Sequence, residues 1–130
     1  MTITPIYAAL LGFIFIFLSL RTVRMRGKYK IGIGDGGHPE LQRQIRVHGN
    51  FAENTPIALI LTGMAELQAT AGVVLHLLGL MLLLGRILHA YGVSQSKERF
   101  IFRQIGMVLT HTVIGLAAFI LLYNALLPFF

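Results

Sequence analysis

Residues 39–61 read PELQRQIRVHGNFAENTPIALIL, a polar and charged half followed by an apolar half. As one helix, this stretch places Arg46, Asn50 and Glu53 at i, i+4 and i+7, within about 60° of arc on one face. The apolar half is long enough to enter a bilayer, so the polar stripe is carried into a membrane or to its edge. Charged side chains at that depth are costly, and they indicate either a functional site or a packing contact.

The composition is that of a membrane protein rather than a soluble domain. Hydrophobic residues make up 55% of the 130 residues and charged residues only 12%, and the mean hydropathy is +0.74. The length allows a single domain over residues 1–130. Because the chain has no cysteine, a thiol reaction would need a thiol cofactor.

The positive charge is confined to two parts of the chain. All eleven Lys and Arg residues lie in 21–46 and 86–103, next to apolar runs. A nucleic-acid binder would present a basic face on a soluble fold, so the net charge of +6 does not indicate a nucleic-acid partner. Basic clusters at the ends of apolar runs instead indicate cytoplasmic loops of an integral membrane protein.

The apolar runs predict an all-α integral membrane protein, an antiparallel bundle of four transmembrane helices. The predicted spans are 3–26, 39–69, 73–92 and 100–127, the last ended by Pro128. The second would be about 46 Å long against about 30 Å of hydrocarbon, so its first turns should project from the membrane, and Pro56 should bend it. The basic loops 27–38 and 93–99 predict that the polar helix ends face the cytoplasm and that both termini face outward.

Polar residues from all four predicted helices share the cytoplasmic side. They are Arg24 on the first, Arg46, Asn50 and Glu53 on the second, Arg86, His89 and Tyr91 on the third, and Arg99 and Arg103 on the fourth. A basic site with one carboxylate suits a small anionic ligand that also carries an amine or amide. The structural alternative is that the arginines extend to lipid headgroups and that Arg46 and Glu53 pair to fix helix packing.

Other kinds of site receive little support. The glycine-rich segment 27–38 lacks the preceding strand and the Gly-Lys-Ser/Thr of a phosphate loop. His76 and His111 stand alone on apolar spans and are expected to be packing residues; with no cysteine and no closely spaced histidines, no metal site is predicted. Glu66 near the outer end is expected to be interfacial or solvated.

The pattern Arg46-x-x-x-Asn50-x-x-Glu53-x-x-Pro56 on the second of four spans resembles the signature of the MAPEG superfamily, membrane-associated proteins in eicosanoid and glutathione metabolism. Other parts of the chain are similar to the same family. They are Val23-Arg24-x-Arg26, Arg86-x-x-His89, and Arg103 in the first turn of the fourth span. The resemblance covers essentially the whole chain. The motif Gly-Asp-Gly-Gly at 34–37 resembles that of a bacterial branch of the family.

This resemblance implies a homotrimer of four-helix subunits in a bacterial inner membrane, with reduced glutathione bound between neighbouring subunits at the cytoplasmic face. Arg24 and Arg46 would take its carboxylates, Glu53 its ammonium and Asn50 an amide. Arg103 would be the catalytic residue, stabilising the thiolate. The other members of the implied binding site are Arg86, His89, Tyr91 and Arg99. Tyr91 is offset from the family's tyrosines at the end of the third span, and His89 only partly replaces them.

The implied activity is a glutathione S-transferase or peroxidase acting on hydrophobic electrophiles or lipid hydroperoxides that arrive from the bilayer. Two alternatives stay open. One is a non-catalytic protein that binds lipid or glutathione on the same scaffold. The other is a small transporter, although its polar stripe should run through the whole span, whereas Ile57, Ile60 and Met64 continue this face beyond Glu53.

Overall fold

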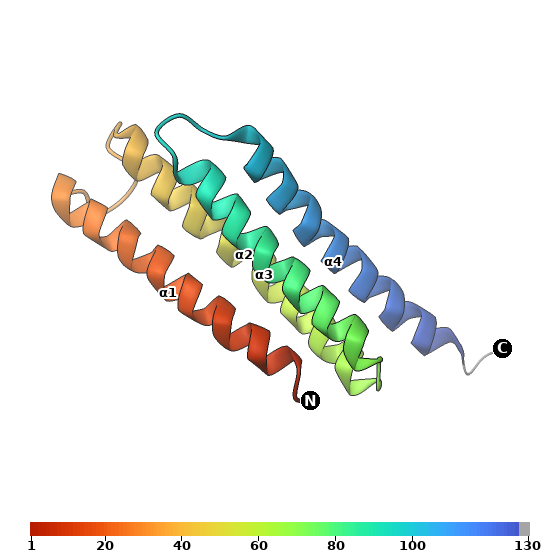
Figure 1. The fold of residues 1–130 in the computed structure, drawn as a ribbon. Coiled ribbons are helices and arrows are strands. Elements are labelled where there is room, and N and C mark those ends of the chain that lie inside the picture. The colour runs from red at the N-terminus through yellow and green to blue at the C-terminus, as the bar shows by residue number, and fades with distance from the viewer. Residues whose placement is uncertain (128–130) are drawn as a thin grey trace.

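The computed structural model describes residues 1–127, which form four long helices joined by short connections. The helices are α1 (Thr4–Tyr29), α2 (Pro39–Leu67), α3 (Gly72–Ser94) and α4 (Phe100–Leu126). Successive helices run in opposite directions, and the amino end of α1 and the carboxyl end of α4 lie at the same end of the bundle (Figure 1). The predicted all-α bundle is therefore confirmed. Pro128, the predicted stop of the last helix, lies outside the described residues.

Two helices extend past their predicted ends. α1 ends at Tyr29 instead of residue 26, and α3 ends at Ser94 instead of residue 92. Gly27 does not stop α1, because a single glycine weakens a helix without breaking it. The helix stops where Lys30 takes a left-handed φ of 55° and the Ile31 N–H donates to the Arg26 carbonyl at 3.0 Å.

The glycine-rich connection between α1 and α2 is a compact turn. The guanidinium of Arg26 donates to the carbonyl oxygens of Gly32 and Gly34, each at 3.0 Å, which ties the loop to the end of α1. Pro39 then occupies the first turn of α2, where its missing N–H costs nothing. Gly34, Gly36 and Gly37 have positive φ angles, so the glycines of this segment serve the turn.

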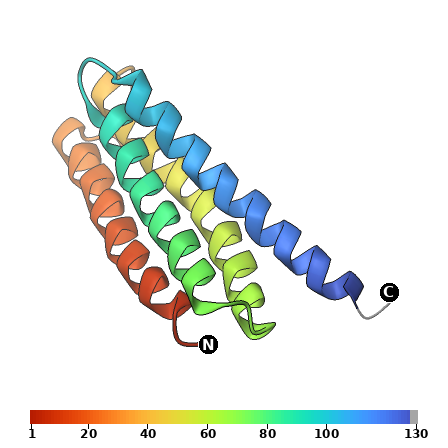
Figure 2. The ribbon, with the colours of Figure 1, turned by 45° about the vertical axis from the view of Figure 1, so that its right-hand side comes forward.

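α2 and α3 form the centre of the subunit. α1 packs on one side of this pair and α4 on the other, and α1 and α4 do not touch within residues 1–127. Figures 1 and 2 show α4 diverging from the other helices towards its carboxyl end. Leu11 and Leu18 of α1, Phe51 of α2, Leu82 of α3 and Val113 of α4 belong to the buried core. The core thus lies along the α2–α3 pair.

Glycines bring α3 and α4 into close backbone contact. A Cβ atom at Gly106 would lie 2.5 Å from the Gly85 carbonyl oxygen and 2.6 Å from the His89 nitrogen. A Cβ at Gly92 would lie 2.7 Å from the Arg103 nitrogen. Small residues at helix contacts are typical of membrane bundles, where close packing replaces the hydrophobic effect. This seam sets the position of Arg103 relative to α3.

Three of the helices, α1, α3 and α4, are long and apolar enough to cross a membrane. Their outward faces carry large exposed hydrophobic side chains, for example Phe13, Val73 and Phe119. α2 is equally long but carries charged residues in its first half. In water such faces would be unfavourable, so they are lipid-facing surfaces.

Glu66, in the last turn of α2, caps the amino end of α1. One carboxylate oxygen accepts the Ile3 N–H and the other accepts the Thr4 N–H, each at 2.8 Å, and the Thr2 N–H also donates to it. The prediction of an interfacial or solvated residue therefore missed these bonds. The carboxylate satisfies N–H groups that have no partner within the helix and lies at the positive end of its dipole.

Replacing Glu66 by Gln is expected to lower the melting temperature of the detergent-solubilised protein by a few degrees. Glutamine keeps one acceptor oxygen but loses the charge and the second acceptor. Differential scanning fluorimetry measures the shift, with Glu40→Gln as the control because Glu40 accepts only from the Tyr29 hydroxyl. Equal melting temperatures for E66Q and the unsubstituted protein would show that the cap does not stabilise the bundle.

Candidate functional site

Arg46 and Glu53 form an ion pair on the outside of the subunit. The Arg46 Nη1 atom lies 3.3 Å from Glu53 Oε1, and the two side chains are 61% and 57% exposed. Both residues project from the outward face of α2, and the apolar Ile57, Ile60 and Met64 follow on that face. The two charges therefore lie beside an exposed apolar surface on the outside of the bundle.

Asn50 and Arg86 bind each other inside the subunit. Arg86 is 1% exposed and Asn50 6%. The Arg86 Nη1 atom donates to Asn50 Oδ1 at 3.0 Å and to its carbonyl oxygen at 3.3 Å, and Nη2 lies 3.7 Å from the Met107 sulfur. Within residues 1–127 no carboxylate pairs with this guanidinium. The contact joins α2, α3 and α4 at one point.

The stripe on α2 is therefore divided. The helical spacing predicts that Arg46, Asn50 and Glu53 face a ligand together. In the structure Arg46 and Glu53 are exposed, whereas Asn50 is buried against α3. Asn50 lies at one edge of the 60° arc, and the packing of α3 against this edge is enough to bury it. Arg86, predicted as a ligand at a helix end, is the largest fully buried side chain.

The other predicted site residues of α3 and α4 lie at the same end of the bundle. His89, one turn after Arg86, is buried. Arg103 pairs with Glu98 across 2.7 Å and is 44% exposed. Arg99 directly precedes α4, makes no side-chain hydrogen bond to the start of that helix, and is exposed. These residues of α2, α3 and α4 therefore lie at the same end of the bundle, and their joint action on one ligand stays a prediction.

Arg24 and Tyr91 are not brought to this cluster. Arg24 is exposed, and the residues that α1 buries against the bundle are others, among them Leu18 and Thr22. Tyr91 faces the groove between α1 and α3 and makes an edge contact with Phe102 at 5.5 Å. The assignment of Arg24 and Tyr91 to the site of Arg46 and Glu53 therefore stays a prediction.

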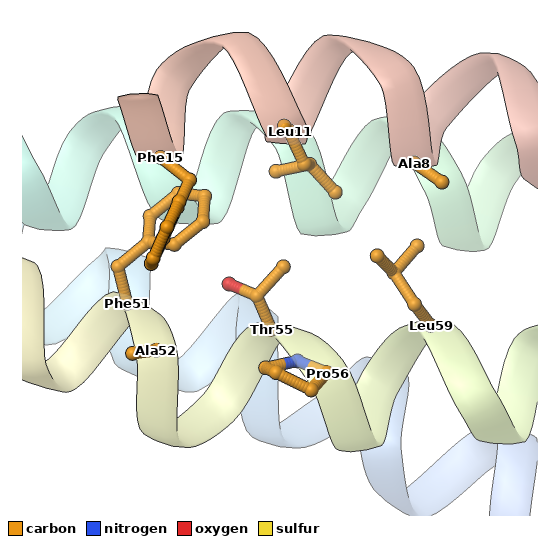
Figure 3. Close-up of a pocket in the computed structure, with 9 residues that line it drawn as sticks. Ala8, Leu11, Phe15, Phe51, Ala52, Thr55, Pro56 and Leu59 are labelled. Atoms are coloured by element: carbon orange, nitrogen blue, oxygen red, sulfur yellow. The ribbon is translucent and has the colours of Figure 1, made fainter. Parts of the chain in front are cut away.

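An apolar groove of about 390 Å³ lies between α1 and α2 (Figure 3). Phe15 and Phe51 close one end, and the Thr55 side chain rises from α2 into the space between the helices. Thr55 is 4% exposed, and among residues 1–127 its hydroxyl has no hydrogen-bond partner. The next residue, Pro56, has no N–H to donate to the Ala52 carbonyl, so α2 lacks one helical hydrogen bond beside the groove.

The two histidines predicted to be packing residues, His76 and His111, are both exposed. The His76 Nδ1 atom lies 3.1 Å from the Tyr7 hydroxyl, so His76 makes a contact between α3 and α1 but is not buried. The part of the chain that the structure describes contains no group of three His, Cys, Asp or Glu side chains able to hold a metal ion.

Comparison with known proteins identifies the relatives of this chain. The model of the MAPEG family matches residues 4–123. Inner membrane protein YecN of Escherichia coli strain K12 is 37% identical over 108 residues, which cover 83% of this chain and 81% of that protein. YecN of Escherichia coli O6:H1 strain CFT073 matches with the same identity and coverage. Together with the bundle of apolar helices, this match over nearly the whole chain shows that the protein is an integral membrane protein of the MAPEG family.

Proposed function

We propose that the protein binds reduced glutathione at the Arg46–Glu53 pair and activates its thiol for reaction with a hydrophobic electrophile or a lipid hydroperoxide. The observation that carries the proposal is this exposed pair of opposite charges on the outward face of α2. Glutathione carries two carboxylates and one ammonium, so one end of it presents the same two charges. Arg46 binds a carboxylate, and Glu53 binds the ammonium once the pair has opened.

Arg103 is the residue that stabilises the thiolate. A guanidinium beside a thiol favours its ionised form, which is the nucleophile. Arg103 is partly exposed at the start of α4, on the same end of the bundle as Arg46. The thiolate then attacks the electrophile directly, and positioning and electrostatics supply the rate.

A homotrimer completes the site in this proposal. Within one subunit Arg24 and Tyr91 lie away from the Arg46–Glu53 pair. A neighbouring subunit packed against the outward face of α2 would bring a second set of α1 and α3 residues to the pair and cover its charges. The subunits sit in a bacterial inner membrane, as the name of the relative YecN supports, with the basic ends of the helices in the cytoplasm.

Binding without turnover is the second candidate, and one observation favours it. Glu98 lies 2.7 Å from Arg103, so a carboxylate already neutralises the cation that should hold the thiolate. Catalysis requires that ion pair to open when glutathione binds. A transporter gains no such support, because the outward face of α2 is apolar beyond Glu53.

Adding glutathione to the purified protein at neutral pH is expected to produce thiolate absorbance in the ultraviolet, and Arg103→Ala to reduce it about tenfold. Lys97→Ala is the matched control, since it removes a cation from the neighbouring loop. Glu53→Gln is expected to weaken glutathione binding, measured by calorimetry, while leaving the absorbance of saturated protein unchanged. Saturable binding without thiolate would identify the non-catalytic candidate, and no binding would refute both.

A further inference from the structure

A second groove, separate from the Arg46–Glu53 pair, lies between α1 and α3 at the basic end of the bundle. Its volume is about 360 Å³. α1 contributes Ile14, Phe17 and Arg21, and α3 contributes Ile87, Tyr91 and Ser94. α1 and α3 make the sparsest contact of the helix pairs that touch, which leaves this space between them. Apart from Tyr91, which the proposed function takes from a neighbouring subunit, the residues that line this groove play no part in that function.

The groove changes from apolar to polar along its length. Ile14 and Phe17 lie deeper along α1 than Arg21, and on the antiparallel α3 Ile87 lies deeper than Ser94. The side chains at the deep end are aliphatic or aromatic, and those at the shallow end donate hydrogen bonds. This order matches a molecule with an acyl chain and a polar head that lies in the membrane with its head at the basic end.

Arg21 supplies a positive charge at the shallow end. Its guanidinium lies 5.6 Å from the centre of the Phe17 ring, and its Nη1 atom donates to the Ser94 hydroxyl at 3.3 Å. A guanidinium has five N–H donors, and within the described residues no carboxylate pairs with this one. No acidic residue lines the groove. The Arg21 guanidinium can therefore bind an anion at this end of the groove.

We propose that this groove is a binding site for an anionic phospholipid. The phosphate is bound by the Arg21 guanidinium and the Ser94 hydroxyl, and one acyl chain lies along Phe17, Ile14 and Ile87. Charge complementarity selects an anionic headgroup over a zwitterionic one. The apolar half of the groove distinguishes this lipid from free phosphate, which could bind only to Arg21 and Ser94 at the polar end.

Thermal unfolding of the delipidated protein in detergent, titrated with phosphatidylglycerol, tests the proposal. Arg21→Gln is expected to weaken the apparent affinity for phosphatidylglycerol about fivefold. Lys28→Gln is the matched control, because it removes a cation at the same end of α1 without touching the groove, and its effect should be less than about twofold. Phosphatidylcholine and inorganic phosphate are expected to stabilise the protein less than phosphatidylglycerol does.

Filling the groove tests the acyl-chain half separately. Ala90→Phe, with Ile87→Phe as a second variant, places an aromatic ring in the space while every charge remains. Each is expected to reduce the number of phosphatidylglycerol molecules retained in native mass spectra, with an unchanged lipid-free melting curve. Equal weakening by R21Q and K28Q would indicate general attraction to the surface and overturn the site. The site would also be overturned if both filled variants retained as much phosphatidylglycerol as the unsubstituted protein, or if inorganic phosphate stabilised the protein as much as phosphatidylglycerol does.

Discussion

Replacing Asn50 by leucine is expected to reduce the free energy of unfolding by about 2–3 kcal/mol, because Arg86 would keep its charge inside the subunit and lose the side-chain acceptor that binds it. The guanidinium is 1% exposed and has no carboxylate partner within residues 1–127. Among residues 1–127 the guanidinium has two other acceptors, the Asn50 carbonyl, which already accepts from the same nitrogen, and the weakly accepting Met107 sulfur.

Asn54→Leu is the matched control for this substitution. Asn54 lies one turn further along α2, is partly buried, and only donates to the Asn50 carbonyl. Its loss should cost about 1 kcal/mol or less. Chemical denaturation in mixed micelles measures the free energy of unfolding of both variants. The double variant N50L/R86M is expected to recover most of the lost stability, since an apolar pair can replace a buried polar one. Failure of this rescue would show that Asn50 acts through something other than Arg86.

Replacing Gly106 by leucine is expected to have the other large effect, a loss of about 3 kcal/mol or more. Even a Cβ atom at this position would overlap the Gly85 carbonyl and the His89 backbone. α4 would have to move away from α3 along the seam where the two helices are closest. Because Arg103 lies one turn before Gly106, the same shift should abolish thiolate formation in the proposed reaction.

Gly115→Leu provides the control on the same helix. A Cβ atom at Gly115 would meet nothing within 4 Å, so the leucine side chain would lie on the exposed face of α4. Its melting temperature and its yield in the membrane fraction are expected to match those of the unsubstituted protein. If G115L were as unstable as G106L, the effect would come from altering α4 in general and not from the seam.

The existence and direction of the helices could be predicted from the sequence, because runs without charge and flanking arginines are strong signals in a membrane protein. The rotation of each helix about its axis could not. The lipid-facing and core-facing sides are both apolar here, so periodicity does not reveal that Leu82 is buried while Leu84 is exposed. The same ambiguity led to Asn50 and Arg86 being predicted as ligand-facing.

The ends of the helices depended on local turn chemistry. Gly27 resembles a stop signal, yet the helix continues to Tyr29 because the true stop is the left-handed Lys30. The cap on α1 could not be predicted from nearby residues at all, since Glu66 lies 62 positions beyond Thr4. Contacts of this range follow from the pairing of α1 with α2, which has to be known first.

That cap also bears on how the chain is synthesised. The amino end of α1 leaves the ribosome first, but the carboxylate that binds its N–H groups comes from the end of α2. The first helix therefore remains without its cap until the second has been made and inserted beside it. α1 and α2 are expected to reach their native form together as a hairpin, so a truncated chain that ends before Glu66 would present an uncapped first span to the insertion machinery.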